Sequence, residues 1–481
     1  MSATKNVIYN ILINVLNVAV PIVTVPYVSR VFGVENIGVV NFALTYASYF
    51  TLFIYLGIPI YGTREIGKLR NAPIQRDYVV SELFNIMLVS SLIFTAGYVV
   101  SIAVVPTLRQ EWPFLMAAGV GLLFSSFNVD WYYTGRENLK ISAVRNLIVK
   151  AVGLMILFVW IRTPNDLLLY LVLNALTNGL AQVWTFVYML RHDVRLRWRR
   201  LKIKRHLKPV IVLSLSSLAI SIYTMLDVLM LGFLSTYTEV GYYSSAIKIS
   251  RLLLPVVTAS AMVAIPRIAH LYKENDISEL RRVTDKSFSF MSLLAPPITI
   301  GLVVISSPFV PFFFGAEFVG AVPSMMIVSL LVILIGINNF YGPQILVPTD
   351  NEKWFLYAVL FGTGSNFLLN LFFIPRWGAV GASWASVVAE TIVTGMVMWF
   401  AYRLVPQIRP NYRPLIQSII ASLPMFLYGY LFIQWSDSPI GSLTGITICS
   451  AMTFILLELI VFRDPMAMEI RDKLYTKLHL R

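Results

Sequence analysis

The sequence predicts an all-α polytopic membrane protein with fourteen transmembrane helices. Hydrophobic residues make up 57% of the 481 residues and charged residues only 13%, with a mean hydropathy of +0.74. A soluble domain is about a quarter charged. Apolar stretches of about 18 to 25 residues, long enough to cross a bilayer, follow one another with short loops between them. They do not alternate with period two, so in lipid each stretch must be a helix.

The order of the spans, together with the charge of their loops, predicts the orientation. The predicted spans are 7–29, 38–60, 79–104, 114–130, 142–161, 167–190, 209–233, 240–264, 287–306, 320–341, 355–374, 378–402, 414–434 and 441–461. Most of the 38 Lys and Arg residues lie in or beside every second loop, on the side that also holds the two termini. The opposite loops hold only Arg30, Arg109, Arg162 and Arg376. Positive charge stays on the cytoplasmic side, so both termini are predicted to be cytoplasmic in a bacterial inner membrane.

A basic loop divides the chain. We predict an N-terminal bundle at 1–190, a basic cytoplasmic linker at 191–208, a C-terminal bundle of six spans at 209–402, and the last two spans with a cytoplasmic tail at 403–481. A faint repeat crosses this divide, because Glu35–Ala43 and Glu239–Ala246 both place Gly, a small polar residue and Ala at the start of a span. Two six-helix halves that insert the same way up would be related by an axis along the membrane normal.

Composition also excludes several function classes. The net charge of +14 lies in cytoplasmic loops beside anionic headgroups, so we expect no nucleic-acid partner. The single cysteine, Cys449, excludes a disulfide within the chain and a cysteine-based metal site. The histidines fall in predicted loops or the tail without metal-ligand spacing: His192, His206, His270 and His479. We therefore expect no metal, no cofactor and no catalytic residues, and predict a transporter rather than an enzyme.

Three cations fall deep inside the apolar spans, at Lys150, Lys248 and Arg251. A charge at bilayer depth costs roughly 3 kcal/mol, so it normally faces a partner or an aqueous path. Lys248 and Arg251 are three residues apart and share one helix face. With Arg30 at the outer end of the first span, these four residues predict a cationic path that binds an anionic substrate.

Two acids also lie deep within the spans. Asp227 and Glu390 are predicted either to couple transport to an ion or proton, or to hold the cations in place. Counted at about 1.5 Å per residue, Asp227 and Lys248 lie at similar depths and could form a pair. Asp130 and Glu82 lie near span ends, where we expect their side chains to snorkel toward water.

Several stretches resemble one transporter family. They are Val25–Gly38, Trp131–Glu137, Asp227–Gly232, Val240–Ala246, Asn366, Asn370, Ile374–Pro375 and Gly378–Ala382 through Glu390. These stretches resemble the Wzx-type O-antigen flippases, in the polysaccharide branch of the multidrug/oligosaccharidyl-lipid/polysaccharide exporter superfamily. The resemblance is spread over the first twelve spans.

The resemblance implies two six-helix bundles around a central cavity, with alternating access. It implies that undecaprenyl-diphosphate-linked oligosaccharide moves from the cytoplasmic to the periplasmic leaflet, driven by an ion or proton gradient. Glycan polymerase and chain-length or export proteins are the implied partners.

Three other functions are weighed against this one. A lipid II flippase would also need a cationic cavity and stays open. A drug or cation exporter of the same superfamily would have an acid-dominated cavity, whereas here the cations deep in the spans outnumber the deep acids, three to two. A membrane glycosyltransferase or polymerase would need a large catalytic loop on the far side, and those loops are too short.

Overall fold

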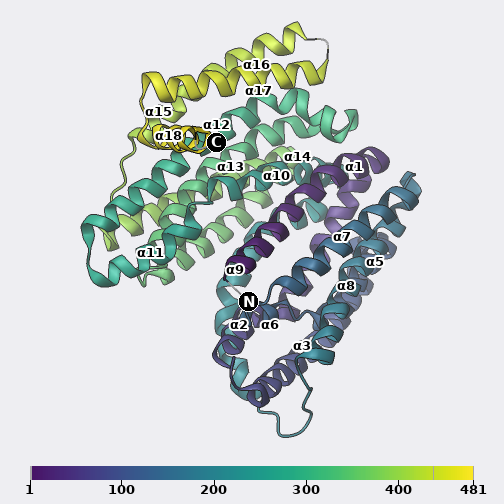
Figure 1. Ribbon diagram of the computed structural model, residues 1–481. Coiled ribbons are helices and arrows are strands. Elements are labelled where there is room, and N and C mark those ends of the chain that lie inside the picture. Colours follow the sequence, from purple (N-terminus) through teal and green to yellow (C-terminus); the bar gives the residue numbers. More distant parts are fainter. Residues whose placement is uncertain (1–2, 437, 480–481) are drawn as a thin grey trace. The chain divides into compact units, whose positions relative to one another are not determined.

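The computed structural model describes residues 3–436 and 438–479 of the chain. Throughout this described part, every regular element is a helix (Figure 1), which confirms the predicted all-α class. The chain forms two compact units, Met1–Gly241 and Tyr242–Arg481. The four-part division predicted from the loops concerns the order of membrane crossings and stays a prediction.

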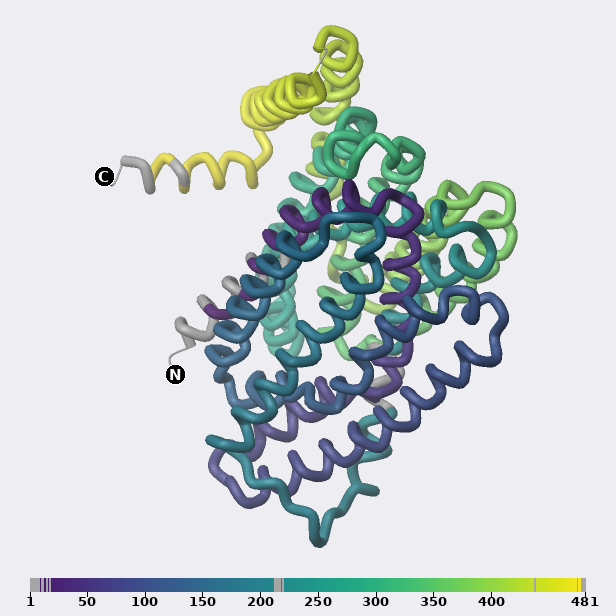
Figure 2. Tube along the Cα trace, turned by 90° about the vertical axis from the view of Figure 1, so that its right-hand side faces the viewer, coloured from purple at the N-terminus to yellow at the C-terminus, as the bar shows by residue number. Residues whose placement is uncertain are grey.

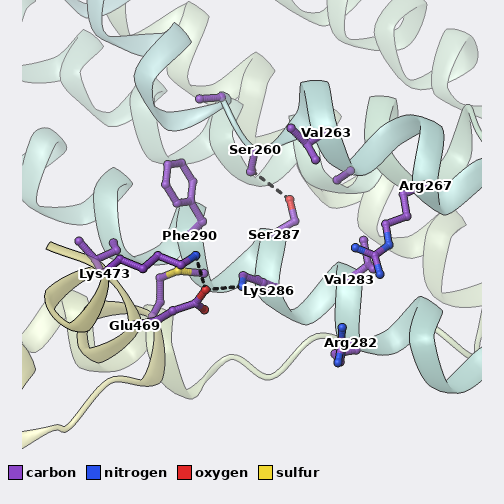
Figure 3. Close-up of a pocket in the computed structure, with 14 residues that line it drawn as sticks. Ser260, Val263, Arg267, Arg282, Val283, Lys286, Ser287, Phe290, Glu469 and Lys473 are labelled. Atoms are coloured by element: carbon purple, nitrogen blue, oxygen red, sulfur yellow. Dashed lines mark hydrogen bonds and ion pairs between the residues drawn. The ribbon is translucent and has the colours of Figure 1, made fainter. Parts of the chain in front are cut away.

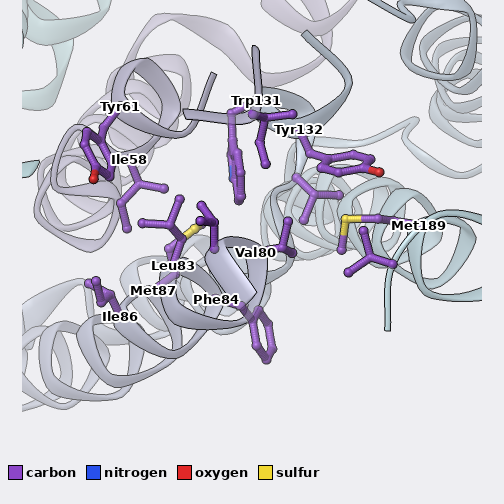
Figure 4. Close-up of a cluster of buried hydrophobic side chains, with 14 of the residues drawn as sticks. Ile58, Tyr61, Val80, Leu83, Phe84, Ile86, Met87, Trp131, Tyr132 and Met189 are labelled. Atoms are coloured by element: carbon purple, nitrogen blue, oxygen red, sulfur yellow. The ribbon is translucent and has the colours of Figure 1, made fainter. Parts of the chain in front are cut away.

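The first unit packs around long helices. Its elements are α1 (Ala3–Tyr55), α2 (Ile58–Lys68), α3 (Pro73–Val104), α4 (Pro106–Gln110), α5 (Trp112–Phe124), η1 (Ser125–Phe127), α6 (Asp130–Gly135), α7 (Lys140–Trp160), η2 (Pro164–Asp166), α8 (Leu167–His192) and α9 (Lys204–Leu234). Its core joins α2, α3, α6 and α8, where Trp131 lies among Ile58, Leu83 and Met87 (Figure 4). A side chain at Gly62 would overlap the ring of Trp131, so this glycine allows α2 and α6 to approach closely.

The second unit begins within α10. Its elements are α10 (Tyr237–Val257), α11 (Ala261–Glu274), α12 (Ile277–Phe314), η3 (Ala316–Gly320), α13 (Ala321–Tyr341), η4 (Gly342–Leu346), α14 (Glu352–Leu404), α15 (Arg413–Ser422), α16 (Pro424–Trp435), α17 (Pro439–Leu456), η5 (Leu457–Val461) and α18 (Pro465–His479). Helices α16 and α17 pack together, and α18 then turns away from the direction of α17 (Figure 2).

Two of the helices are broken at a glycine. In α1 the break is at Gly33, where φ is 73°, and in α14 it is at Gly378, where φ is 51°. L-residues rarely adopt such values, and glycine adopts them at little cost. Helix α14 therefore carries the predicted spans 355–374 and 378–402, and α1 carries 7–29 and most of 38–60, whose last residues lie in α2.

The predicted span at 240–264 covers two helices rather than one. Helix α10 stops at Val257, and α11 begins at Ala261 after a bend of 48°. Pro255 lies in the last turn of α10, where its missing N–H removes one helical hydrogen bond. Among the described residues, ten helices are long and apolar enough to cross a membrane, or eleven if the bent pair α10–α11 is one crossing.

The two copies of the sequence repeat contact each other within the first unit. A Cβ atom at Gly38 would lie 1.7 Å from the carbonyl oxygen of Tyr237, and one at Gly241 would lie 2.2 Å from that of Val34. Gly38 faces the residue four positions before Gly241, and Gly241 faces the residue four positions before Gly38. The contact is reciprocal, as expected where two similar helix starts cross about a local two-fold axis.

Candidate functional site

Lys150 lines a cavity of the first unit in which polar groups lie among apolar ones. The cavity has a volume of about 210 Å³ and lies between α1, α7 and α8. Asn174, Thr177 and Asn178, at i, i+3 and i+4 on α8, present amide and hydroxyl groups along it, and Thr24 of α1 adds a further hydroxyl. Lys150 is the charged residue among the described lining residues. The site therefore combines one cation with several groups that donate and accept hydrogen bonds.

Lys248 and Arg251 lie on one exposed face of α10. Their neighbours Ile247, Ile249 and Ser250 are buried, so the helix packs through its other faces. The hydroxyl of Tyr243 on α10 lies 3.0 Å from that of Ser386 on α14. The two cations are therefore presented together from a helix that is fixed in the second unit.

The remaining predicted site residues are distributed over both units. Arg30 is exposed on α1, and Asp227 is buried on α9 with an exposed fraction of 5%. Glu390 is buried on α14 and accepts a hydrogen bond of 2.6 Å from the Asn338 amide of α13. Arg30, Lys150 and Asp227 thus belong to the first unit, and Lys248, Arg251 and Glu390 to the second. The predicted Asp227–Lys248 pair stays a prediction.

An apolar groove of about 710 Å³ runs along the second unit. It is formed mainly by α12, α16, α17 and α18 and is lined by side chains such as Leu293, Ile305, Met425 and Phe454. One acid, Glu458, lies in this lining with an exposed fraction of 1%, and neither of its carboxylate oxygens has a hydrogen-bond partner among the described residues. A hydrocarbon chain fits such a groove better than water does.

A buried network fixes the basic linker, and the sequence did not indicate it. The Glu82 carboxylate of α3 accepts hydrogen bonds from the backbone N–H of Lys202, from the Arg205 guanidinium and from the His206 ring, at 2.5 to 2.7 Å. The other ring nitrogen of His206 lies 2.7 Å from the Tyr61 hydroxyl of α2. The expectation that Glu82 snorkels is wrong, because the linker folds over it and excludes water. His206, predicted in a loop, lies buried in α9.

A second ion pair involves the buried Arg145, which lies in the predicted span 142–161 but at its polar end. Its guanidinium makes two parallel bonds, of 2.9 and 3.0 Å, to the carboxylate of Asp130 and a third, of 2.7 Å, to Thr185. The Asp130 side chain is 40% exposed, so it still reaches the surface as expected while it pairs with Arg145. A charge inside an apolar run was the available signal, and it applied to Arg145 as much as to Lys150.

Two family models match the chain, each over more than half of its length. The model described as "Polysaccharide biosynthesis protein" matches residues 3–272, and that described as "Lipid II flippase MurJ" matches residues 141–439. A protein of Escherichia coli (strain K12), described as "Putative O-antigen transporter", is 24% identical over 413 residues, which are 83% of this chain and 97% of that protein. A shorter match, 28% identical over 172 residues, covers 35% of this chain and 36% of the "Probable flippase AglR" of Haloferax volcanii.

Two solved structures share the fold. "Lipid II flippase MurJ, inward closed conformation" has a TM-score of 0.75 at 14% identity and covers 96% of this chain and 99% of its own. An inward-facing multidrug resistance transporter of the MATE family and the MOP superfamily has a TM-score of 0.58 at 14% identity, covering 85% and 96%. At these identities the likeness concerns the fold.

Proposed function

Because the chain belongs to the polysaccharide biosynthesis protein family and, by the second match, to the MurJ family, we propose that it is a flippase for lipid-linked oligosaccharide. The proposed substrate is an undecaprenyl-diphosphate-linked O-antigen or exopolysaccharide repeat unit. It moves from the cytoplasmic to the periplasmic leaflet by alternating access, with a proton or ion gradient as the coupled driving force.

The Lys150 cavity is the observation that carries this proposal. Sugars and a diphosphate cannot cross hydrocarbon without polar partners, because each unsatisfied polar group costs several kcal/mol there. The ammonium group of Lys150 suits a phosphate oxygen, and the Asn174, Thr177 and Asn178 side chains suit sugar hydroxyls. A cavity that places one cation and several hydrogen-bonding groups between three membrane-spanning helices supports such a substrate.

The apolar groove of the second unit fits the other end of the same substrate. A polyprenyl chain gains free energy from each CH₂ group that leaves water, about 0.8 kcal/mol, and an apolar protein surface can replace lipid around it. The groove of about 710 Å³ along α12, α16 and α17 offers such a surface. We propose that the polyprenyl chain lies there while the sugars pass through the polar path.

The topology that we propose has fourteen crossings. An α-helix needs about 20 residues to cross the hydrocarbon core, which is about 30 Å thick. Helices α1 and α14, with 53 residues each, are far longer than one crossing and are broken near their middle at Gly33 and Gly378. Each of these two helices supplies two crossings. Helix α9 supplies one crossing, and the bent pair α10–α11 supplies another. In the proposed topology both termini are cytoplasmic in a bacterial inner membrane.

The remaining charges complete the proposed path. Arg30, Lys248 and Arg251 engage the diphosphate or acidic sugars in turn, while the buried acids Asp227 and Glu390 link transport to proton movement or hold the cations in place. With the cytoplasm negative, moving about two negative charges outward is favoured by roughly 4 to 5 kcal/mol per 100 mV. Glycan polymerase and chain-length or export proteins are the proposed partners on the receiving side.

A lipid II flippase is the second candidate function. The match of residues 141–439 to the MurJ family favours it. Both substrates carry the same undecaprenyl diphosphate, so the chain's cations serve either one. The two functions differ only in the glycan that the polar cavity accepts.

Removal of the α10 cations tests the proposal. We expect Lys248→Ala and Arg251→Ala each to abolish surface-glycan assembly in a complementation assay, because each removes a charge from the phosphate path while leaving the packed faces of α10 unchanged. Membrane levels of the variants, measured by immunoblot, should stay normal.

The matched control removes an exposed cation outside the path. Arg162→Ala changes a residue in the short segment between α7 and α8, and we expect it to leave glycan assembly unchanged. Full activity of both α10 variants at normal membrane levels would contradict a cationic path through Lys248 and Arg251.

A further inference from the structure

A second cationic site lies outside the proposed substrate path. A half-open cavity of about 520 Å³ is lined by α11, the beginning of α12 and the tail helix α18 (Figure 3). Four cations from these three helices line it: Arg267, Arg282, Lys286 and Lys473. Its volume lies in the range of small-molecule sites, about 300 to 1,000 Å³.

The acids at this cavity do not balance its cations. The Glu469 carboxylate is shared by Lys286 at 2.7 Å and Lys473 at 2.6 Å. Glu279, beside the cavity, is shared by Arg267 and by Arg282 at 3.0 Å. Four cations on two carboxylates leave a net charge of +2. The hydrogen bonds from the two lysines lower the pKa of Glu469 to about 2, so this balance holds at neutral pH.

The cavity also has an apolar side. Val263 of α11, Phe290 of α12, and Met466 and Ile470 of α18 line it together with the cations. In Figure 3 the Phe290 ring lies on the same side of Lys286 as the carboxylate of Glu469, beyond the end of Lys473. A site that places apolar groups beside cations fits an amphiphile with an anionic head. A free anion would leave the apolar side in contact with water.

The position of the cavity is that of a lipid headgroup. Helix α12 has 38 residues and is about 57 Å long, whereas the hydrocarbon core is about 30 Å thick. The charged residues of α12 are all among its first ten, so this end extends beyond the hydrocarbon, and the cavity lies along it. Basic pockets at this depth bind the phosphates of anionic lipids.

We propose that the cavity between α11, α12 and α18 binds the phosphate headgroup of an anionic phospholipid. The phosphate accepts hydrogen bonds from Lys286, Lys473 and Arg282, and the glycerol and first acyl carbons contact Phe290 and Ile470. The bound lipid offsets the excess positive charge and joins the tail helix α18 to α11 and α12. This site is independent of the proposed flippase function.

Native mass spectrometry of the full chain in neutral detergent, titrated with phosphatidylglycerol, tests the proposal. We expect Lys286→Ala combined with Lys473→Ala to weaken phosphatidylglycerol binding at least about tenfold, because a charge-assisted hydrogen bond contributes about 1.5 to 3 kcal/mol. Phosphatidylcholine should bind wild type and variant alike. The single variant Lys473→Gln, at a side chain that is 70% exposed, changes no buried contact and should weaken binding in the same direction.

Two further arms identify the ligand. Arg199→Ala combined with Arg200→Ala removes two exposed cations from the linker and should leave phosphatidylglycerol affinity unchanged. Millimolar inorganic phosphate should displace little of the lipid. Equal affinity of wild type and both lysine variants, an equal loss in the linker variant, or full displacement by inorganic phosphate would each overturn the assignment.

Discussion

Replacing Gly38 or Gly241 with alanine should abolish surface-glycan assembly and lower the midpoint of thermal unfolding. The new methyl group would lie 1.7 Å from the carbonyl oxygen of Tyr237 in the first case and 2.2 Å from that of Val34 in the second. Both obstacles are backbone atoms, which cannot rotate aside, so α1 and α10 must move apart. Overpacking of this kind costs about 1 to 3 kcal/mol or more. Complementation and a thermal unfolding scan of the purified variants measure the two effects.

Glycines in open positions provide the control. Gly364→Ala and Gly395→Ala on α14 add the same methyl group where no atom lies within 4 Å, and we expect normal activity with equal or slightly higher stability. The double variant Gly38→Ala with Gly241→Ala should lose less stability than the sum of the single losses, because one methyl group already separates the helices. Strict additivity, or normal stability of both single variants, would contradict the reciprocal crossing.

Replacing Glu82 with alanine should release the basic linker from the first unit. The carboxylate holds the Lys202 backbone, Arg205 and His206, and hydrogen bonds to charged groups contribute about 1.5 to 3 kcal/mol each. Its loss also leaves His206 buried beside Tyr61 without an acid partner. Because the linker is rich in Lys and Arg, trypsin should cut the variant between residues 195 and 205 many times faster than wild type.

An exposed acid provides the comparison for Glu82. Glu137 forms a surface ion pair with Arg70, and such pairs contribute about 0 to 1 kcal/mol, so Glu137→Ala should leave the rate of linker cleavage unchanged. If trypsin cuts Glu82→Ala at the wild-type rate, the Glu82 carboxylate does not hold the linker.

The helical class followed from the sequence because lipid leaves the backbone few alternatives. The break at Gly33 falls between two predicted spans, and Gly378 is the first residue of the predicted span 378–402. The end of α10 was missed because Thr258 and Ser260 interrupt an otherwise apolar stretch only weakly. The bend after Pro255 depends on packing that the hydropathy of single residues does not report.

The site was predictable in part. Lys150 stood out as a charge in an apolar run, and the polar groups at Asn174, Thr177 and Asn178 recur at helical spacing, a signal that could have placed α8 beside it. The partner of Glu82 could not be found in this way, because Arg205 lies 123 residues away in sequence. Such pairs are created by the tertiary fold. A charge near a span end looks the same whether it snorkels or is covered by a linker.

The central claim, that the chain carries an anionic lipid-linked glycan across the bilayer through a cationic polar path, is tested most directly by transport in proteoliposomes. Purified protein is reconstituted with labelled undecaprenyl-diphosphate oligosaccharide, or with lipid II in a parallel arm, and lipid that reaches the opposite leaflet is measured with and without a pH gradient. The account predicts transfer of the oligosaccharide substrate well above that of protein-free vesicles, and loss of transfer in Lys150→Ala and Lys248→Ala. Transfer of neither lipid above the protein-free rate, or equal transfer by wild type and both lysine variants, would contradict it.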